Sequence, residues 1–225
     1  MSESTSQPAD ALSKVKIRTF LALELPDALR AGVAEIIARL QKGVMFTGAH
    51  PKWVDPASIH LTLKFFGDTT LEQRDEILHA LRPVAKRHAP HRVRLEGIGV
   101  FPTPRQPRVL WLGVKKAHAL NALQEAIDAA LDPIGWETEE REYRPHLTLA
   151  RIKGQRRTQP LMDVVRSHRG LTLGEWPVNE MVLMQSTLRP AGAEYISLAR
   201  IPLTGTEPPP RIRAAAPEVE SDDSD

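Results

Sequence analysis

The chain has 225 residues, 41% of them hydrophobic, so it is long enough to bury one sizeable core or two small lobes that share a core. It contains no cysteine, which excludes disulfide bonds, thiolate nucleophiles and thiolate zinc sites and makes an intracellular location the simplest expectation. Its net charge is +2, but both ends are acidic, so the body between them is more basic than this value suggests. The basic charge fits an anionic partner such as RNA, and it equally fits an ordinary solvated surface.

The two ends of the chain, residues 1–14 and 205–225, are predicted to be disordered. The first is rich in Ser, Thr and small residues, and the second is rich in Pro and ends in an acidic run. Such segments lack the apolar surface that offsets the entropy lost on ordering. The start of the chain also lacks the basic flank and apolar run of a secretory signal, and no apolar run approaches the roughly 20 residues that span a bilayer. We therefore expect one domain at 15–204 in a cytoplasmic protein that has no membrane partner.

The first part of the body predicts a strand followed by a helix. Residues 17–25 (IRTFLALEL) are short and apolar and end before Pro26, as in a buried strand. From Asp27 to Gly43, apolar side chains recur at helical spacing, which predicts an amphipathic helix.

A second strand and helix follow a Pro-containing turn, WVDPAS. The strand covers IHLTLKFFG at 59–67 and is predicted to end at Gly67. A helix is predicted to begin near Thr69, because Thr69 and Glu72 form a capping-box pattern. Pro83 is predicted to kink or end this helix, because proline has no N–H to donate and its ring clashes with the preceding turn.

The second half of the chain mixes strands with helices. Two strands joined by an extended, Pro-rich connector come first, and a helix, a strand, a short helix and three further strands follow. They are predicted at 93–101 and 109–114 (strands), 117–131 (helix), 146–149 (strand), 158–168 (helix), and 171–175, 179–188 and 194–202 (strands). This mixture places the chain in the α+β or the α/β class.

The tetrapeptide HLTL occurs twice, at 60–63 and 146–149. Side chains alternate between the two faces of a strand, so in each copy the His and the Thr share one face and the two Leu share the other. A similar order of helix, HLTL strand and helix surrounds both copies, which indicates a weak internal duplication with two lobes. We expect the two strands to face each other across a cleft and to present His and Thr inward.

Two imidazoles and two hydroxyls in one cleft fit metal-independent cleavage of a phosphodiester. Histidine titrates near neutral pH, so one of His60 and His146 can act as a base while the other acts as an acid. In-line displacement at phosphorus needs those two proton transfers on opposite sides. The hydroxyls of Thr62 and Thr148 can donate hydrogen bonds to the non-bridging phosphoryl oxygens, where negative charge accumulates. The residues alone leave open which histidine is the acid.

Two other interpretations of the motifs compete with catalysis. A single His-Thr pair on an amphipathic strand is commonly structural, but packing does not require His and Thr at matched places twice. His60 and His146 with a carboxylate could bind zinc or iron, yet the sequence has no HExxH motif, and neither HLTL copy has an acidic residue within its strand. We therefore expect neither a metal nor another cofactor.

Three segments together resemble one known family. They are KWVDPASIHLTLKFFG, YRPHLTLARI and GIGVFPTPRQPRVLWLGV. They are similar to segments of the bacterial RNA 2',3'-cyclic phosphodiesterases, historically called 2'-5' RNA ligases, which belong to the two-histidine phosphoesterase superfamily. The resemblance covers nearly the whole body and leaves both tails outside. It implies a bilobal α+β fold in which two pseudo-symmetric lobes, each with an antiparallel sheet and helices, enclose a cleft.

The resemblance also implies a reaction and the residues that carry it. The reaction is hydrolysis of a 2',3'-cyclic phosphate at an RNA end, for instance on a tRNA fragment, to a 2'-phosphomonoester. His60 would be the proton donor to the leaving 3'-oxygen, and His146 the proton acceptor that activates water. Thr62 and Thr148 would hold the phosphoryl oxygens, and Arg151 is the next expected phosphate contact. The same groups would join a cyclic-phosphate end to a 5'-hydroxyl through a 2'-5' linkage.

Strand parity bears on the residues that follow the two motifs. Arg151 lies five positions after His146, so an ideal strand would turn it to the opposite face unless a bulge or the strand end brings it back. Lys64 and Phe66 share the His60 face by the same rule, where they could touch phosphate, stack on a base or simply line an exposed strand.

Other functions fit the same motifs. A phosphodiesterase for a small cyclic nucleotide or a nucleotide-sugar phosphate would use the same residues, and the basic loop at 151–157 favours RNA over such a substrate. A non-catalytic RNA-binding module could use the duplicated strands as a platform, but it would not require a titrating pair of histidines. We expect a monomer, because the cleft needs no second chain.

Overall fold

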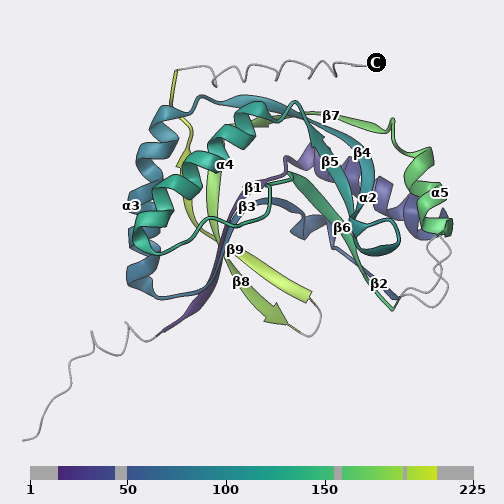
Figure 1. Ribbon diagram of the computed structural model, residues 1–225, viewed down its shortest axis with the longest axis horizontal. Helices are drawn as coiled ribbons and strands as arrows, with labels where there is room; N and C mark the ends of the chain where they lie inside the picture. The colour runs from purple at the N-terminus through teal and green to yellow at the C-terminus, as the bar shows by residue number, and fades with distance from the viewer. Residues whose placement is uncertain (1–14, 44–49, 155–158, 190–191, 207–225) are drawn as a thin grey trace, which may run out of the picture.

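The computed structural model describes residues 15–43, 50–154, 159–189 and 192–206 (Figure 1). Its strands, helices and short 3₁₀ helices (η) are β1 (Ile17–Glu24), α2 (Asp27–Gly43), β2 (His50–Trp53), η1 (Pro56–Ser58), β3 (His60–Thr69), α3 (Leu71–Arg87), β4 (His91–Thr103), β5 (Gln106–Lys115), α4 (His118–Leu131), η2 (Asp132–Ile134), β6 (His146–Lys153), α5 (Gln159–Ser167), β7 (Thr172–Val178), β8 (Glu180–Arg189) and β9 (Gly192–Pro202). The tail predicted at 1–14, and all but the first two residues of the tail predicted at 205–225, lie outside the described residues. Among the helices described, none is long and apolar enough to cross a membrane.

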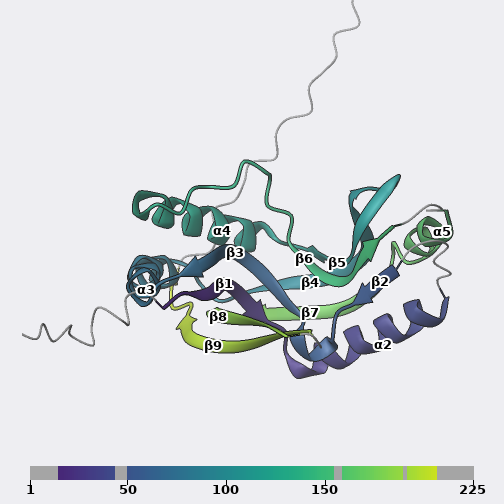
Figure 2. The same cartoon turned by 90° about the horizontal axis from the view of Figure 1, so that it is seen from below.

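The strands form two antiparallel sheets. One sheet has the order β3-β1-β8-β9, and the other has the order β2-β6-β5-β4-β7 (Figures 1 and 2). Each HLTL segment begins a strand, β3 in the first sheet and β6 in the second, and these two strands contact each other. The predicted α+β class and the two-lobed arrangement are therefore confirmed, and the duplicated motif lies where the lobes meet.

The helices are exchanged between the two lobes. Helix α2 follows β1 of the first sheet in the chain, but it packs against β7 of the second sheet. Helix α4 follows β5 of the second sheet, but it packs against α3 and against β3 of the first sheet. Figure 1 accordingly shows α3 and α4 together on one side and α2 and α5 together on the other. Each lobe is thus covered by a helix from the other half of the repeat, which couples the two lobes mechanically.

The core consists of one large apolar cluster and one small one. The large cluster contains alternate residues of β1, such as Leu21 and Leu23, together with buried side chains of both sheets and of all four α-helices. The opposite face of β1 carries Phe20 and Ala22, which form the small cluster with residues of β8. This alternation follows from the two-residue period of a strand, and it leaves the small cluster on the face of the first sheet that also carries His60.

Helix α3 differs from its prediction at both ends. The capping box is made by Thr70 and Gln73, one residue later than predicted: the backbone N–H of Gln73 donates to Thr70 Oγ1 at 3.2 Å, and the N–H of Thr70 donates to Gln73 Oε1 at 2.9 Å. Thr69 remains in β3, where its hydroxyl donates to the carbonyl of Ile17 at 3.0 Å. Pro83 does not end the helix, which continues to Arg87, so this part of the prediction is wrong. Pro83 is solvent-exposed, so water can satisfy the carbonyl that lacks its N–H partner.

Two connections also differ from the sequence prediction. The Pro-rich segment predicted as an extended connector is instead the end of a hairpin, in which β4 and β5 pair as far as Thr103 and Gln106. Strand β2 was not predicted, because its four residues, HPKW, include Pro51, which cannot donate to a ladder. The strand tolerates this proline because β2 lies at the edge of its sheet, beside β6.

Candidate active site

The two HLTL strands contain the same irregularity. In β3, Thr62 pairs with Ala22 and Lys64 with Leu21, so Leu63 has no opposite residue and forms a bulge. In β6, Thr148 pairs with Trp111 and Ala150 with Leu110, so Leu149 forms the corresponding bulge. The bulges fall on the second Leu of each HLTL motif, which extends the internal duplication from sequence to backbone geometry.

The bulges decide which side chains share the face of the histidines. Beyond Leu149, the bulge reverses the parity and brings the exposed Arg151 to the face of His146, which is the repair that the sequence left open. In β3, the same reversal overturns the parity prediction for Lys64 and Phe66. Both of these side chains are buried, and it is Phe65, 45% exposed, that takes the position corresponding to Arg151.

Each imidazole is fixed by a backbone carbonyl two residues earlier in the chain. His60 Nδ1 lies 2.9 Å from the carbonyl oxygen of Ser58, and His146 Nδ1 lies 2.7 Å from that of Arg144. A carbonyl can only accept, so Nδ1 carries the proton in both rings. In the neutral form, Nε2 is therefore the basic nitrogen of each histidine, and it is available for proton transfer.

Aromatic side chains pack against His60. Its ring centroid lies 4.7 Å from that of Phe20 on β1 and 4.9 Å from that of Tyr195 on β9, the latter in an edge-to-face arrangement. Phe20 and Tyr195 also contact each other edge to face. These contacts leave His60 only partly exposed and fix the orientation of its ring.

His146 has an aromatic neighbour of its own. The ring of Phe101 on β4 lies edge to face with it at 5.0 Å, and Trp111 on β5 packs against Phe101 at 5.1 Å. Trp111 in turn lies over Gly99, where an added Cβ would come within 2.1 Å of the indole ring. Glycine at this position therefore allows the tryptophan to support the wall beside His146.

One guanidinium acts on both imidazoles. Burial is the largest cause that lowers the pKa of His60 and of His146 below the ordinary value of 6.5, while the hydrogen bond to the backbone carbonyl opposes this shift in each ring. The positive charge of Arg151 lowers both pKa values further. Because one side chain acts on both rings, His60, His146 and Arg151 lie in the same region of the molecule.

Replacing Arg151 with alanine is expected to raise the pKa of both His60 and His146, because the charge that disfavours both imidazolium forms is removed. NMR titration of the imidazole resonances would measure the two pKa values. The matched control is Arg166→Ala, which removes an exposed arginine paired with Asp163 on α5 and should leave both values unchanged. A rise at only one histidine would contradict a shared site.

The segment between α4 and β6 connects the two motifs. Lys64 Nζ donates to Asp128 Oδ1 on α4 at 2.7 Å and to the carbonyl of Glu137 at 2.6 Å. The hydroxyl of Tyr143 donates to the carbonyl of Thr62 at 3.1 Å, and the carbonyl of the next residue along the chain accepts from the second histidine. Residues 135–145 are thus bound to β3 at two points, Thr62 and Lys64, and to His146 of the second motif at a third.

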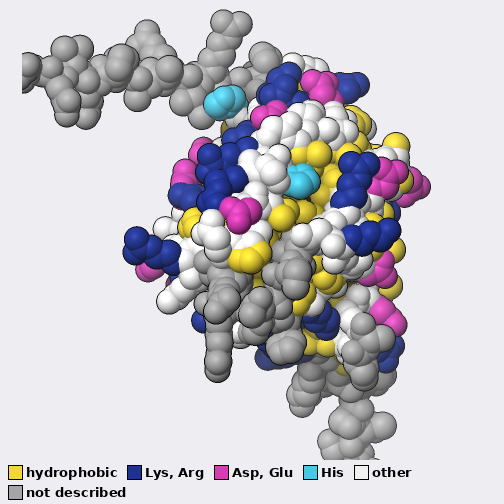
Figure 3. All heavy atoms as spheres, turned by 90° about the vertical axis from the view of Figure 1, so that its right-hand side faces the viewer, with side chains coloured by type: hydrophobic (Ala, Val, Ile, Leu, Met, Phe, Trp, Pro, Cys, Tyr) yellow, Lys and Arg dark blue, Asp and Glu magenta, His cyan; other side chains and the backbone are white. Residues whose placement is uncertain are grey.

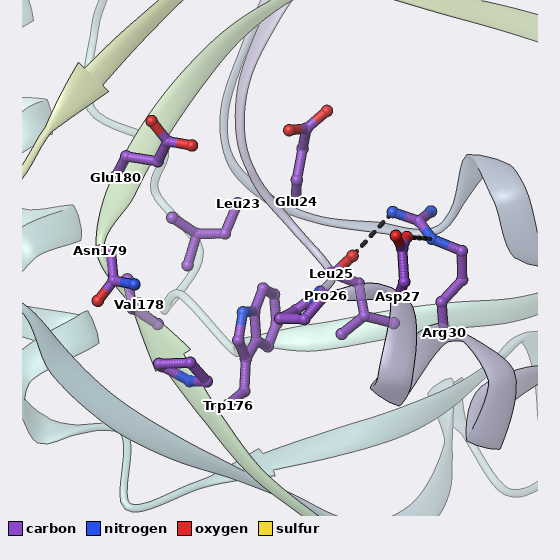
Figure 4. Close-up of a pocket in the computed structure, with 11 residues that line it drawn as sticks. Leu23, Glu24, Leu25, Pro26, Asp27, Arg30, Trp176, Val178, Asn179 and Glu180 are labelled. Carbon is purple, nitrogen blue, oxygen red and sulfur yellow. Dashed lines mark hydrogen bonds and ion pairs between the residues drawn. The ribbon is translucent and has the colours of Figure 1, made fainter.

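A cleft of about 1010 Å³ opens beside these residues. Thr62 and His146 both line it, together with Phe101 from the β4–β5 hairpin, one face of α4 and the segment 138–144. A pocket of about 320 Å³ lies elsewhere, where β1 leads into α2, and is lined by Glu24, Arg30 and Trp176 among others (Figure 4). Of the five predicted site residues, only Thr62 and His146 line the larger cleft, and His60, Thr148 and Arg151 do not. None of the five lines the smaller pocket, so the larger cleft is the candidate substrate site.

The face that carries α2 and α5 has mixed charge, and the described residues contain no group of metal ligands. On the face that carries α2 and α5, basic and acidic side chains are interspersed rather than separated (Figure 3). The basic loop predicted at 151–157 lies partly outside the described residues. Over the part of the chain that the structure describes, no group of three or more His, Asp and Glu side chains is arranged to hold a metal ion.

The family of the chain follows from its sequence. One family, the 2'-5' RNA ligase superfamily, matches residues 25–189. The chain belongs to this superfamily. A similar protein is the RNA 2',3'-cyclic phosphodiesterase of Methanothermobacter thermautotrophicus, which is 35% identical over 184 residues that cover 82% of this chain and 97% of the relative.

Two solved structures have a similar fold. The protein TT0787 of Thermus thermophilus is 30% identical and superimposes with a TM-score of 0.68 over 85% of this chain and 100% of that chain. E. coli LigT in its apo form, at 22% identity, has the same fold, with a TM-score of 0.67 over 85% of this chain and 99% of that chain.

Sequence reasoning missed the residues of this superfamily member that support the site from other elements. Tyr195 and Phe101 reach the histidines from strands far away in the chain, and no pattern in the sequence connects them to HLTL. Tyr143 precedes the second motif by three residues, but its bond to Thr62 depends on the contact between β3 and β6. The catalytic and binding roles of His60, Thr62, His146, Thr148 and Arg151 stay predictions.

Proposed function

We propose that this protein is an RNA 2',3'-cyclic phosphodiesterase that acts by metal-independent acid-base catalysis with His60 and His146. The observation that carries the proposal is the pair of equivalent imidazoles, each held through Nδ1 by a carbonyl and both under the influence of Arg151. The curated relatives with 31–35% identity are named RNA 2',3'-cyclic phosphodiesterases, which supports the same substrate for this chain.

The proposed reaction is an in-line displacement at phosphorus. Nε2 of neutral His146 takes a proton from water, and the water oxygen forms a bond to phosphorus. The bond between phosphorus and the 3'-oxygen breaks on the opposite side, and protonated His60 gives its proton to that oxygen. The products are a 3'-hydroxyl and a 2'-phosphomonoester, and the two histidines have exchanged protonation states. The assignment of acid and base follows the order of the motifs in the family that the sequence resembles.

The remaining site residues are proposed to hold the phosphoryl group. The hydroxyls of Thr62 and Thr148 would donate to its two non-bridging oxygens, and the guanidinium of Arg151 would pair with the charge that develops on them. Thr62 lines the cleft and Arg151 is exposed on the His146 face, so a ligand can reach both. Because all five residues come from one chain, we propose that a monomer is sufficient for activity.

The protonation states fit these roles once the substrate is bound. The lowered pKa values keep both imidazoles largely neutral at pH 7 in the free protein, so His146 is ready to act as a base. A bound phosphodiester is an anion, and its charge favours the imidazolium form of His60 that the acid step requires. Joining a cyclic-phosphate end to a 5'-hydroxyl in a 2'-5' linkage would use the same groups, with the hydroxyl in the place of water.

Hydrolysis of a defined RNA end tests this function. A short RNA with a 2',3'-cyclic phosphate would be incubated with the protein in EDTA, and 2'- and 3'-phosphate products would be separated. We expect the 2'-phosphate alone, at a rate that EDTA does not change. Ligation would be tested by adding an RNA with a 5'-hydroxyl and probing for a 2'-5' linkage.

Each other outcome points to a different function. An intact RNA together with cleavage of small cyclic nucleotides or nucleotide-sugar phosphates would identify a small-molecule phosphodiesterase. Binding of RNA without any turnover would identify a binding module, and formation of a 3'-phosphate would overturn the assignment of the leaving group.

A further inference from the structure

The cleft extends well beyond the space that a cyclic phosphate needs. From Thr62 and His146 it reaches one face of α4, where Asn121 and Glu125 both line it. Residues four positions apart lie on the same side of a helix, so these two side chains form one wall. A substrate that extends from the phosphate past Thr62 and His146 into this cleft would meet the wall.

The α4 wall is rich in hydrogen-bond acceptors. Asn121 lines the cleft, and its Oδ1 is turned away from solvent and has no partner within the described part of the chain, so a rotation of the side chain that brings Oδ1 into the cleft breaks no hydrogen bond of this oxygen. Glu125 adds an exposed carboxylate one turn along the helix. After this rotation, a ligand that donates hydrogen bonds would meet two acceptors on the wall.

The charges around the cleft oppose a second phosphate. The segment 138–144 contributes Glu139, Glu140 and Glu142, against two arginines. One of these arginines, Arg144, is already paired with Glu142 at 3.1 Å. A polyanionic RNA backbone would be repelled from this part of the cleft, whereas an uncharged group with N–H donors would be attracted.

Two aromatic side chains offer flat surfaces to a ligand in the cleft. Phe65 and Phe101 line the same cleft, and Phe65 is 45% exposed. The guanidinium of Arg18 covers one face of the Phe65 ring at 4.8 Å from its centroid, so a stacked ligand would use another part of this surface. Aromatic stacking is the usual way to hold an unpaired nucleobase without regard to its identity.

We propose that the wall formed by Asn121 and Glu125 reads the base of the nucleotide that bears the cyclic phosphate and favours bases with an amino group over uracil. This inference rests on the proposed function. Guanine fits best, because its N1–H and 2-amino group can both donate to one carboxylate, and adenine and cytosine each offer one amino group. Uracil presents two carbonyl oxygens beside its single N–H, and these would face the acceptors.

Four RNAs that differ only in the terminal base test the proposal. Each would end in a 2',3'-cyclic phosphate, and kcat/KM would be measured for G, A, C and U ends. We expect the G end to be hydrolysed with a kcat/KM about tenfold or more above that of the U end, the discrimination typical of one well-placed base contact. Asn121→Ala and Glu125→Gln should each bring this ratio close to one.

Unfolded protein in a preparation lowers the measured kcat/KM for the G end and the U end by the same factor. The ratio of the two values is therefore unaffected by partial unfolding of a variant. The matched control is Glu76→Gln, which makes the same change of charge at an exposed position on α3 and should keep the wild-type ratio. Equal kcat/KM values for G and U ends in the wild-type protein would overturn the inference and leave the proposed function standing. A wild-type preference that survives in both variants would also overturn it.

Failure of the proposed function would be seen separately, as the absence of turnover for all four RNAs. The inference would then be tested by calorimetry with guanosine 2'-monophosphate and uridine 2'-monophosphate. Tighter binding of the guanosine compound that is lost in Asn121→Ala would support the base-reading wall. Equal affinities would overturn it.

Discussion

Replacing either His60 or His146 with alanine is expected to lower kcat by about 10²- to 10⁴-fold, the range that a positioned general acid or base contributes. Each ring is held through Nδ1 by a carbonyl of its own, so neither can move to take the place of the other. The double variant should be only slightly slower than the single variants, because groups that act in one step are not additive. Steady-state hydrolysis of an RNA with a 2',3'-cyclic phosphate end would give kcat for the two single variants and the double variant.

The pH dependence of kcat/KM separates the two roles. With both groups present, the profile should be bell-shaped, because His146 must be neutral and His60 must be protonated. His146→Ala should remove the acidic limb, and His60→Ala should remove the alkaline limb. If both substitutions remove the same limb, the proposed division between acid and base is wrong.

An exposed histidine provides the control for this comparison. His79 lies on α3 and is solvent-exposed, and His79→Ala should leave both kcat and the pH profile unchanged. Loss of activity in His79→Ala would show that the assay responds to histidine content or stability rather than to the site. Full activity in either His60→Ala or His146→Ala would exclude that residue from the reaction.

The sequence predicts the centre of the site because the duplication is visible in four letters. HLTL sets the faces of His60 and Thr62, and of His146 and Thr148, through local strand geometry alone. The prediction fails at the next residues, where Leu63 and Leu149 bulge. A bulge depends on pairing with another strand, so strand parity in one segment cannot show it.

The supports of the site are tertiary, and for that reason they were not predicted. Lys64 has the parity of an active-site residue in its own strand, but the bulge turns it toward Asp128, which comes from a helix of the other half of the repeat. The partner is set by the exchange of α2 and α4 between lobes, a feature of topology that local patterns do not contain. The same holds for Tyr143, which precedes β6 of the second sheet but bonds to Thr62 on β3 of the first sheet.

Replacing Asp128 with alanine is expected to destabilise the protein by about 3–5 kcal/mol, because it leaves the charge of Lys64 buried without its partner. The side chains of Lys64 and Asp128 are only 4% and 8% exposed, and Asp128 also accepts from Gln124 at 2.7 Å. The free energy of unfolding, measured by urea denaturation, would show the loss. Asp163→Ala is the matched control, because it removes a solvent-exposed partner of Arg166 on α5 and should cost about 0–1 kcal/mol.

The double variant Lys64→Met, Asp128→Leu separates stability from positioning. Replacing a buried ion pair with apolar side chains is often neutral or stabilising, so its free energy of unfolding should return to near the wild-type value. Gln124 would lose its acceptor and the carbonyl of Glu137 its donor, and residues 135–145 would be held less firmly against β3. We therefore expect a stable protein with a lowered kcat. A stable double variant with wild-type kcat would show that the ion pair serves the fold alone. If Asp128→Ala lowers the free energy of unfolding no more than Asp163→Ala does, water reaches Lys64 and the pair is not buried in effect.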